Sequence, residues 1–452
     1  MADKVFFISQ KVLLAAMLFA MQLTAVGQDD ITQDSLVKNS IDCAHQLLWT
    51  HFMDMENGLL FDYVDSEGPT AVPTPHECRM HLPNALSWWV PNENGAFFNG
   101  LYLQAVCDRW KFQKDEVTES RARKLASGLI LLSNVGRTAG FIARGVSTDG
   151  VTHFPLSSVD QTYPWFYGLW KYAQSGLVNN VERSAIIDMM EFNALALDSY
   201  NWGIPCEDSI FGYFGGFSGA GFSDAARLLS ILKFMHHLTG NDHWNTLYNE
   251  KLTEIPAHSE HSRLDILAGG IVYDPSLDHH SFWTSSMDQA ALLELYLLEE
   301  REHIRSRFRQ GLDQNARNAA RHIADYAKFD NQTQLGFSPD WRLLNPLWRP
   351  QKSWEEAWEL ADEQLVLWDS ISPRKGYELA FMMEPLNAAW IVALSGNREI
   401  MDSVKHHIHN ALSHYNWSTM SYSTFFIAEC VYYTLYDMQQ DGAFQDEYLD
   451  GL

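Results

Sequence analysis

Apolar and polar positions along this chain alternate in blocks of helical length. Aromatic-rich stretches that are apolar on almost every side of a helix are followed by stretches with only one apolar face. Helices that are apolar all round are buried, whereas helices with one apolar face lie at the surface. The apolar stretch recurs six times, beginning at Glu93, Asp160, Gly221, Asp288, Tyr377 and Ser421. The alternation predicts an all-α fold, an (α/α)6 toroid in which a ring of inner helices is enclosed by outer ones.

Helix boundaries follow from this periodicity and from the turn residues between the blocks. We expect helices at 33–54, 94–111, 115–134, 161–175, 178–198, 222–239, 241–254, 285–300, 303–328, 353–369, 377–395, 398–414 and 421–438. The loops before inner helices are long, and the turns after them are short. All inner helices would then begin at one rim that carries the elaborate loops, and function is expected there.

The N-terminal segment has the composition of an export signal. Lys4 and Lys11 precede a short apolar run, and Ala25-Val26-Gly27 supplies small residues at the expected cleavage point. The run is too short for a stable membrane span. We therefore expect a signal peptide at 1–27, a single barrel domain at 28–452, and a protein that is exported to a periplasm or the exterior and is not embedded in a membrane.

Composition narrows the possible ligands. The formal net charge is −25, which excludes nucleic acid as a partner, since phosphate binding needs a basic face. Aromatic residues make up 13% of the chain, including 16 Trp, and indole faces stack on pyranose rings as well as fill cores. The five cysteines lack C-x-x-C spacing, so neither a metal nor a cofactor is expected.

Two loops have distinctive turn chemistry. The segment 140–160 predicts a short β-hairpin, with strands at 141–144 and 151–154 joined by Thr148-Asp149-Gly150. Arg144 and His153 would fall on the two strands. The glycine-rich segment 201–224 would approach a ligand closely or fold over an opening, and it has no phosphate-loop signature.

The residues Asn92-Glu93-Asn94-Gly95-Ala96 and Asp160-Gln161-x-x-Pro164-Trp165, together with the helical alternation and the leader, resemble six-hairpin glycosidase-like proteins. These (α/α) barrels include unsaturated-uronyl hydrolases, glucoamylase-like enzymes and several polysaccharide lyases. The resemblance implies cleavage of glycosidic bonds in an oligo- or polysaccharide by an exported enzyme. It leaves the reaction type open, because neither the consecutive acidic pair of exported α-mannanases nor the His-Gly-Trp cluster of rhamnogalacturonyl hydrolases is found in the core.

Hydrolysis needs one protonated carboxyl and one ionised carboxylate. Asp160, at the start of an inner helix, suits the base or nucleophile, since the positive helix end keeps it ionised. Glu207 and Asp208, flanked by apolar residues, suit the general acid, since desolvation raises a carboxyl pKa. As catalytic candidates we rank Asp160 first, then Glu207 and Asp208, then Glu93 and Asp288. Predicted substrate contacts are Glu93, Asn94, Asp288, Arg144, Arg79, His76, Trp165 and Trp348.

Two alternatives remain at this stage. A lyase that acts by β-elimination on a uronate would use Arg144 on the carboxylate and His153 or Tyr163 as the base. A non-catalytic barrel would only bind glycans on its tryptophans. The stretch from His76 to His81 superficially resembles a metal cluster, but its two histidines are five apart rather than the four that place ligands on one helix face.

Overall fold

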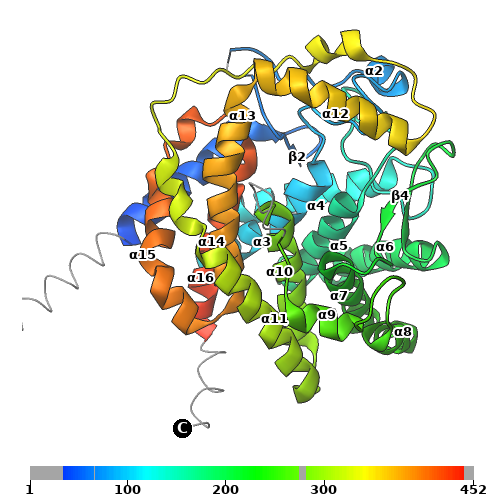
Figure 1. Cartoon of the computed structure of the whole chain (residues 1–452), viewed down its shortest axis with the longest axis vertical. Coiled ribbons are helices and arrows are strands. Elements are labelled where there is room, and N and C mark those ends of the chain that lie inside the picture. Colours follow the sequence, from blue (N-terminus) through cyan, green and yellow to red (C-terminus); the bar gives the residue numbers. More distant parts are fainter. Residues whose placement is uncertain (1–33, 66, 274–280, 442–452) are drawn as a thin grey trace, which may run out of the picture.

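The computed structural model of the protein describes residues 34–65, 67–273 and 281–441 (Figure 1), so the predicted signal peptide lies outside the described residues. The chain is mostly helical, as the sequence predicts. Two small antiparallel sheets are present in the described part, β1 with β2 and β3 with β4.

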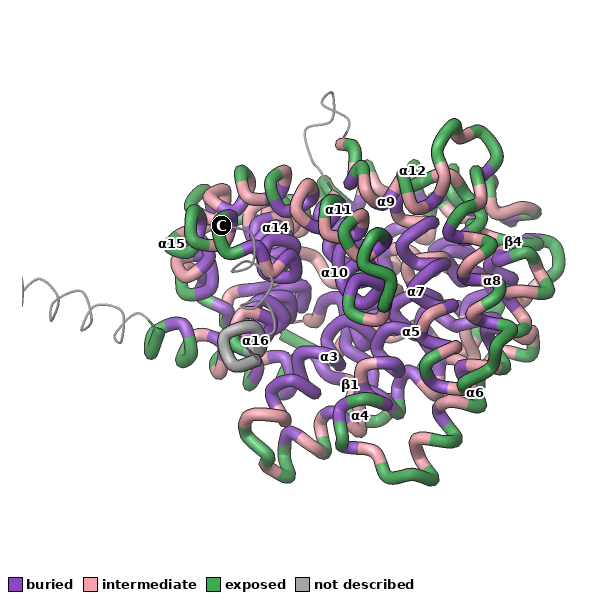
Figure 2. Tube along the Cα trace, turned by 90° about the horizontal axis from the view of Figure 1, so that it is seen from below, coloured by how far each residue is buried: buried purple, intermediate pink, exposed green. Residues whose placement is uncertain are grey.

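A group of inner helices forms the centre of the molecule (Figure 2). They are α3 (Gly95–Gln113), α5 (Val159–Gln174), α7 (Phe222–Thr239), α10 (Phe282–Leu298), α14 (Glu384–Ser395) and α16 (Phe426–Asp441). Each contacts the next in chain order, and α16 contacts α3. In α3 every residue from 95 to 109 is buried, which matches a sequence that is apolar on all sides.

The inner helices α3 and α5 approach each other closely because glycines face the contact. A Cβ atom on Gly100 would lie 2.1 Å from the carbonyl oxygen of Pro164, and one on Gly168 would lie 2.7 Å from the Cα of Gly100. No side chain fits into either space. These glycines therefore allow the short distance between α3 and α5, the two helices that have Glu93 and Asp160 at their N-terminal ends.

The outer helices each bury one face. They are a helix over 34–47, α4 (Glu116–Asn134), α6 (Asn180–Ser199), α8 (Asp242–Thr253), α9 (Arg263–Gly269), α11 (Glu302–Ala320) and α15 (Arg398–His414). In α15 the buried residues Ile400, Val404, Ile408 and Leu412 recur every four positions, the spacing of one helix face. Outer helices pack against the inner helix that precedes them, for example α4 on α3 and α11 on α10.

The remaining elements lie mainly before the inner helices. They are η1 (Leu48–Phe52), β1 (Met53–Asp54), β2 (Leu59–Leu60), α2 (Pro75–Arg79), β3 (Gly203–Pro205), β4 (Tyr213–Gly216), η2 (Ile323–Lys328), η3 (Trp341–Leu347), α12 (Trp354–Ile371), α13 (Pro373–Glu378), η4 (Leu379–Met383), η5 (Trp417–Thr419) and η6 (Ser423–Phe425). Figure 1 places α2, α12 and α13 together at the top of the view. The elaborate segments therefore gather at one end.

The inner helices begin at this same end, because side chains from their first turns meet. The Gln161 Nε2 of α5 donates to the Asn94 Oδ1 just before α3, at 3.0 Å. The backbone N–H of Phe282 in α10 donates to the Glu384 Oε2 of α14, at 2.9 Å. A common N-terminal rim follows, as expected from the loop lengths.

The predicted β-hairpin over 140–160 is wrong. The described structure has no strand between residues 140 and 160, although a turn forms where expected, with the Gly150 N–H donating to the Ser147 carbonyl at 2.9 Å. The flanking backbone bonds to other elements instead: Ala143 N–H donates to Leu132 and Gly95 N–H donates to Arg144, both at 2.9 Å. The segment predicted as the first strand is thus held by α4 and α3, and a single backbone hydrogen bond, from the Ser147 N–H to the Thr152 carbonyl at 2.7 Å, joins the two sides of the turn.

Smaller corrections concern boundaries. The helix expected at 285–300 begins earlier, at Phe282, and the one expected at 303–328 stops at Ala320 before a 3-10 segment. The first helix ends as the π-helical η1, so residue 54 belongs to β1. Within the described residues, none of the helices is long and apolar enough to cross a membrane.

Candidate functional site

A pair of acidic side chains meets at the start of α3. The amide Nδ2 of Asn94 donates to Asp62 Oδ2 at 2.5 Å and to Glu93 Oε1 at 3.1 Å, so one nitrogen bridges both carboxyls. The backbone N–H of Asn94 also donates to Asp62 Oδ1, at 3.1 Å. Asp62 is buried, whereas Glu93 and Asn94 are partly exposed. Glu93 is therefore the member of the pair that can reach a ligand.

The surroundings of this pair raise its affinity for a proton. Burial raises the pKa of both the Asp62 and the Glu93 carboxyl, and the charge of Glu93 raises the pKa of Asp62 further. Two neighbouring carboxyls in a low-dielectric site titrate as a unit, because both cannot ionise at once without repulsion. The raised pKa values favour the protonated form of the pair, which is the form that a general acid needs.

The loop before Glu93 is built to hold its carboxylate. The backbone N–H of Trp89 donates to Glu93 Oε2, and the Asn84 side chain accepts from Trp88 N–H at 3.1 Å. Ser87 and Trp89 have φ values of 58° and 76°, a region that non-glycine residues seldom occupy. Such backbone persists only where its surroundings fix it, and it is common at functional sites.

Helix α12 supplies part of that fixation. The indole Nε1 of Trp89 donates to the Ala361 carbonyl at 3.1 Å. The Gln364 side chain accepts from Asn84 at 2.8 Å and donates to the carbonyl of Pro83 at 2.8 Å. The loop is therefore clamped on α12 from both ends, and the Glu93 carboxylate is held on a rigid support.

Asp160 belongs to the same network. The guanidinium of Arg144 donates through Nε to the Glu93 carbonyl at 3.1 Å and through Nη1 to Ser158 Oγ at 2.7 Å. The Ser158 hydroxyl donates to Asp160 Oδ1. Asp160 is partly exposed in the first turn of α5. The structure thus brings Glu93, Asn94, Arg144 and Asp160 together.

A lysine and an aromatic wall complete this half of the rim. The Nζ of Lys375, from α13, lies 4.1 Å from the centroid of the Trp89 ring, and burial lowers its pKa. Its positive charge favours the ionised form of Glu93. Tyr63 and Tyr422 are buried beside the pair, with ring centroids 5.4 Å apart. Lys375 therefore counterbalances the burial of the two carboxyls.

The opposite half of the rim holds a second group of acids. Asp288 is buried and is saturated by Ser223 Oγ, at 2.5 Å, and by Arg227 Nε, at 2.7 Å. The sequence predicted Asp288 at the start of its helix, but α10 begins at Phe282 and Asp288 lies in the second turn. Asp224 is partly exposed at the start of α7, and burial raises its pKa. Asp288 is placed to anchor α7 against α10.

Glu384 and Trp283 lie where α14 meets α10. Burial raises the pKa of Glu384 to about 7, although the carboxylate accepts the N–H of Phe282. Trp283 is partly exposed, and its ring centroid lies 5.5 Å from that of Phe97 in α3. An indole at this position bridges the two halves of the rim and could stack on a sugar ring.

Glu207 and Asp208, which the sequence favoured as general acids, lie apart from this network. The Glu207 carboxylate accepts the backbone N–H of Arg137, at 2.8 and 3.0 Å, and that of Thr138, at 3.3 Å. It thereby ties the glycine-rich loop to the end of α4. Asp208 Oδ1 accepts the N–H of Ile210 at 3.1 Å within a turn.

The residues proposed for elimination are also separated. Tyr163 is fully buried within α5, where burial raises its pKa, and its hydroxyl lies 3.4 Å from Ser230 Oγ. The Nδ1 of His153 lies 3.0 Å from the Val151 carbonyl oxygen in an exposed turn. Trp165 is fully buried and donates to the Leu129 carbonyl at 2.8 Å, so it packs in the core rather than facing a ligand.

The predicted contacts from α2 and η3 lie on the outside of the molecule. His76 and Arg79 are exposed on α2. Trp348 is partly exposed, and its indole donates to the His81 carbonyl at 3.1 Å. Among the described residues, no group of three His, Cys, Asp or Glu is arranged to hold a metal ion.

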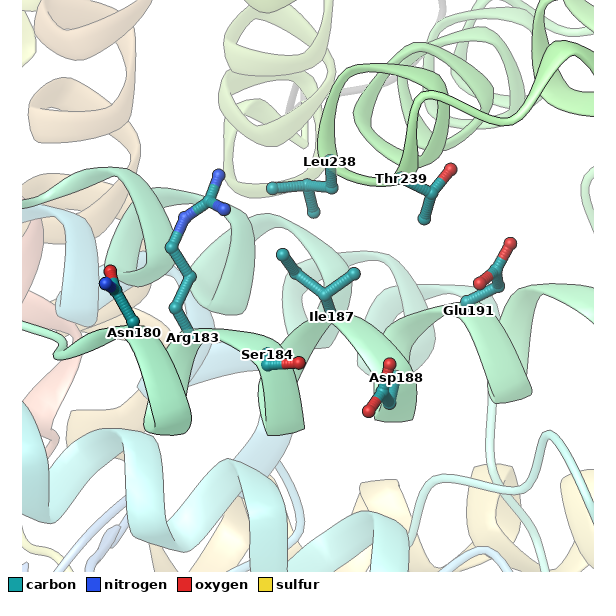
Figure 3. Close-up of a pocket in the computed structure, with 8 residues that line it drawn as sticks. All are labelled: Asn180, Arg183, Ser184, Ile187, Asp188, Glu191, Leu238 and Thr239. Atoms are coloured by element: carbon teal, nitrogen blue, oxygen red, sulfur yellow. The ribbon is translucent and has the colours of Figure 1, made fainter.

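A surface pocket of about 420 Å³ lies between α6 and the end of α7 (Figure 3). It is lined by Asn180, Arg183, Ser184, Ile187, Asp188, Glu191, Leu238 and Thr239. Leu238 and Thr239 are the last residues of α7, so the pocket lies at the end opposite the N-terminal rim. It contains none of the predicted site residues.

Comparison with known proteins does not identify a family for this chain. A scan against models of protein families found no match, and a search of curated proteins found none with significant similarity to the chain. The six-hairpin resemblance stays a prediction.

Three residues of the candidate site were not predicted from the sequence: Asp62, Lys375 and Trp283. Asp62 follows β2, and Lys375 comes from α13, so both are remote in sequence from Glu93. No local pattern marks them, because long-range packing alone places them beside the α3 start. The acid-led start of α3 was the usable signal, and it identified Glu93 and Asn94.

Proposed function

We propose that this protein is an exported carbohydrate-active enzyme that hydrolyses glycosidic bonds at its N-terminal rim. The observation that carries the proposal is the proton-holding pair of Asp62 and Glu93, linked through Arg144 and Ser158 to Asp160. One protonated and one ionised carboxyl at the same site are the minimum equipment for glycoside hydrolysis.

In this proposal Glu93 is the general acid. It donates the proton held by the pair to the leaving glycosidic oxygen, and buried Asp62 raises the affinity of the pair for that proton. Asp160 acts from the first turn of the next inner helix as nucleophile or as base for water. Glycosidases whose two catalytic carboxyls lie about 5–5.5 Å apart retain the configuration of the anomeric carbon, and those with a separation of about 6.5–9.5 Å invert it.

The substrate would lie across the rim on Trp283. This ring is partly exposed, whereas Trp165 is fully buried. Arg144, expected to bind a uronate carboxylate, uses its Nε and Nη1 donors on Glu93 and Ser158. Arg144 is therefore proposed to position the two catalytic carboxyls rather than the substrate.

The architecture we propose is the (α/α)6 toroid of six-hairpin glycosidases. The closed sequence of contacts from α3 to α16 and back to α3, with outer helices packed behind, supports it. A single domain at 28–452 and removal of residues 1–27 on export belong to the same proposal. N-terminal sequencing of protein recovered from outside the cytoplasm would test the cleavage point.

Two other functions are less well supported. Elimination would need a base beside the substrate, yet Tyr163 is fully buried and His153 is turned toward a backbone carbonyl. A lyase would also produce an unsaturated uronate that absorbs ultraviolet light. A barrel that only binds glycans gives no reason for a proton-holding acid pair, which costs free energy to bury.

The test is reducing-end release from a panel of plant and host polysaccharides. We expect Asp160→Asn and Glu93→Gln each to reduce kcat by roughly 10²–10⁴-fold, since both substitutions keep shape and remove the acid or base. Ultraviolet absorbance should stay flat on saturated substrates. Absence of release at any pH, or full activity in both variants, would contradict the proposal.

A further inference from the structure

Outside the rim site, four aromatic side chains from three separate elements meet at the surface. We call Trp88, Phe214, Trp354 and Trp358 the aromatic patch. The ring centroids of Trp88 and Trp358 are 5.0 Å apart, and those of Phe214 are 5.5 Å from Trp354 and 6.0 Å from Trp358. Figure 1 shows α12, which carries both tryptophans, beside β4, which carries Phe214.

The patch is open to solvent. Trp358 is 45% exposed, and Trp88, Phe214 and Trp354 are partly exposed. Trp354 and Trp358 lie one turn apart on α12, and the residues that this helix buries include Ala357, Leu360 and Ala361 but neither of these two tryptophans. Clustered indole surface left in water is unfavourable and marks an interaction site more often than isolated apolar residues do.

Charge around the patch restricts the ligand. Glu355, Glu356 and Glu359 are exposed on α12 beside Trp354 and Trp358. Together with the net charge of −25 they repel polyanions, including nucleic acids and polyuronates. Carboxylates are strong acceptors for hydroxyl groups. Aromatic faces flanked by acceptors match a chain of uncharged sugar rings, which carry apolar faces and hydroxyl edges.

The patch is continuous with the rim site. Trp88 directly precedes Trp89, whose backbone N–H donates to the Glu93 carboxylate. Because consecutive Cα atoms are about 3.8 Å apart, Trp88 lies next to the backbone N–H that binds Glu93, the proposed general acid. A chain held on the patch would therefore extend toward Glu93.

We infer that the aromatic patch binds a neutral glycan chain whose cleaved end enters the rim site. The inference rests on the proposed function in taking a glycan as the ligand. It adds a substrate class, an uncharged polysaccharide. It also adds a binding surface next to the catalytic carboxyls that long chains reach and short oligosaccharides do not.

The experiment is affinity electrophoresis of the full chain in gels that contain hydroxyethyl cellulose, galactomannan or polygalacturonate. We expect retardation by a neutral polymer and not by polygalacturonate. Trp358→Ala should weaken the binding about tenfold, the scale of one lost aromatic stacking contact. Trp358→Phe should restore most of it. Val366→Ala, at a 76% exposed site on the same helix, is the matched control and should bind like the wild type.

The outcomes separate the two proposals. Retardation without reducing-end release would keep the patch and overturn the hydrolase. Release from a neutral polymer with equal efficiency by wild type and Trp358→Ala would keep the hydrolase and overturn the patch. Light scattering during size exclusion checks a protein partner: a wild-type dimer that becomes a monomer in Trp358→Ala would reassign the patch to self-association and overturn the inference.

Discussion

Two buried carboxylate groups in this protein have opposite protonation tendencies. At the rim, burial raises the pKa of Asp62 and Glu93, which neighbour each other. Glu429, in the first turn of α16, is fully buried, but His45 and Arg109 beside it hold its pKa at about 2 despite burial. Burial alone therefore does not decide whether the pKa of a carboxyl is raised or lowered.

The difference lies in what faces each carboxylate. Arg109 Nε donates to Glu429 Oε1 at 2.6 Å, and His45 Nδ1 lies 2.9 Å from Oε2, so the charge is paired across α3, α16 and the first helix. Glu93 receives only neutral donors directly, from Asn94 and Trp89. Removal of one member of a buried ion pair leaves the other charge uncompensated, whereas a carboxyl without a charged partner in direct contact stays available for proton transfer.

Glu429→Gln should have the largest effect, a loss of about 3–5 kcal/mol in the free energy of unfolding at pH 7, because Arg109 and His45 lose their partner. The folded-state pKa lies below the ordinary 4.5, so this stabilisation is present above pH 4.5 and is lost as pH falls toward about 2. Urea denaturation at pH 7 and pH 3 measures both. Asp42→Asn, on the partly exposed side of Arg109, is the control and should cost far less. An equal loss at both pH values would contradict the pairing.

Glu207→Gln distinguishes the rim pair from the acid that the sequence favoured. The neutral amide weakens three hydrogen bonds from Arg137 and Thr138, so we expect a loss of about 1–3 kcal/mol in unfolding free energy. Activity per folded molecule should be retained. Denaturation and reducing-end release on the same preparation check this. Activity lost with stability unchanged would return the catalytic role to Glu207.

Asp62→Asn should alter the pH dependence of activity more than its maximum. The last proton of the pair is retained against repulsion between two carboxylates, and the variant removes one of them. The alkaline limb of kcat/KM should therefore move to lower pH, by about one unit for each 1.4 kcal/mol of repulsion removed. An unmoved limb would show that Asp62 does not share the proton.

Glu384→Gln should have the smallest effect, confined to one pH window. Burial raises the folded-state pKa of Glu384 to about 7 from 4.5, so the folded state binds the extra proton. Its contribution to stability is present below pH 4.5 and declines as pH rises to about 7. Thermal melting across this range should show a flatter pH slope in the variant. An unchanged slope would indicate that another group titrates there.

Helix placement could be predicted because it depends on local signals. Asp115, Asn179, Ser353 and Asn397 each accept a backbone N–H from the first turn of the predicted helix that they precede. The apolar periodicity then fixed which helices are inner. The hairpin over 140–160 failed for the opposite reason, because strand pairing depends on which backbone lies nearby, and α3 and α4 supply those partners.

The candidate site likewise has a part that local sequence signals predict and a part that depends on tertiary contacts. By itself the sequence determined the helices, the acids at their starts and the loops that gather at one rim, since caps and periodicity act over a few residues. Only the tertiary structure decided that Asp62 joins Glu93, that Arg144 links Glu93 to Asp160, and that Glu207 binds backbone instead. The physical reason is that a carboxyl takes its pKa and its role from its neighbours in space, and burial and charge at a site are sums over segments far apart in the chain.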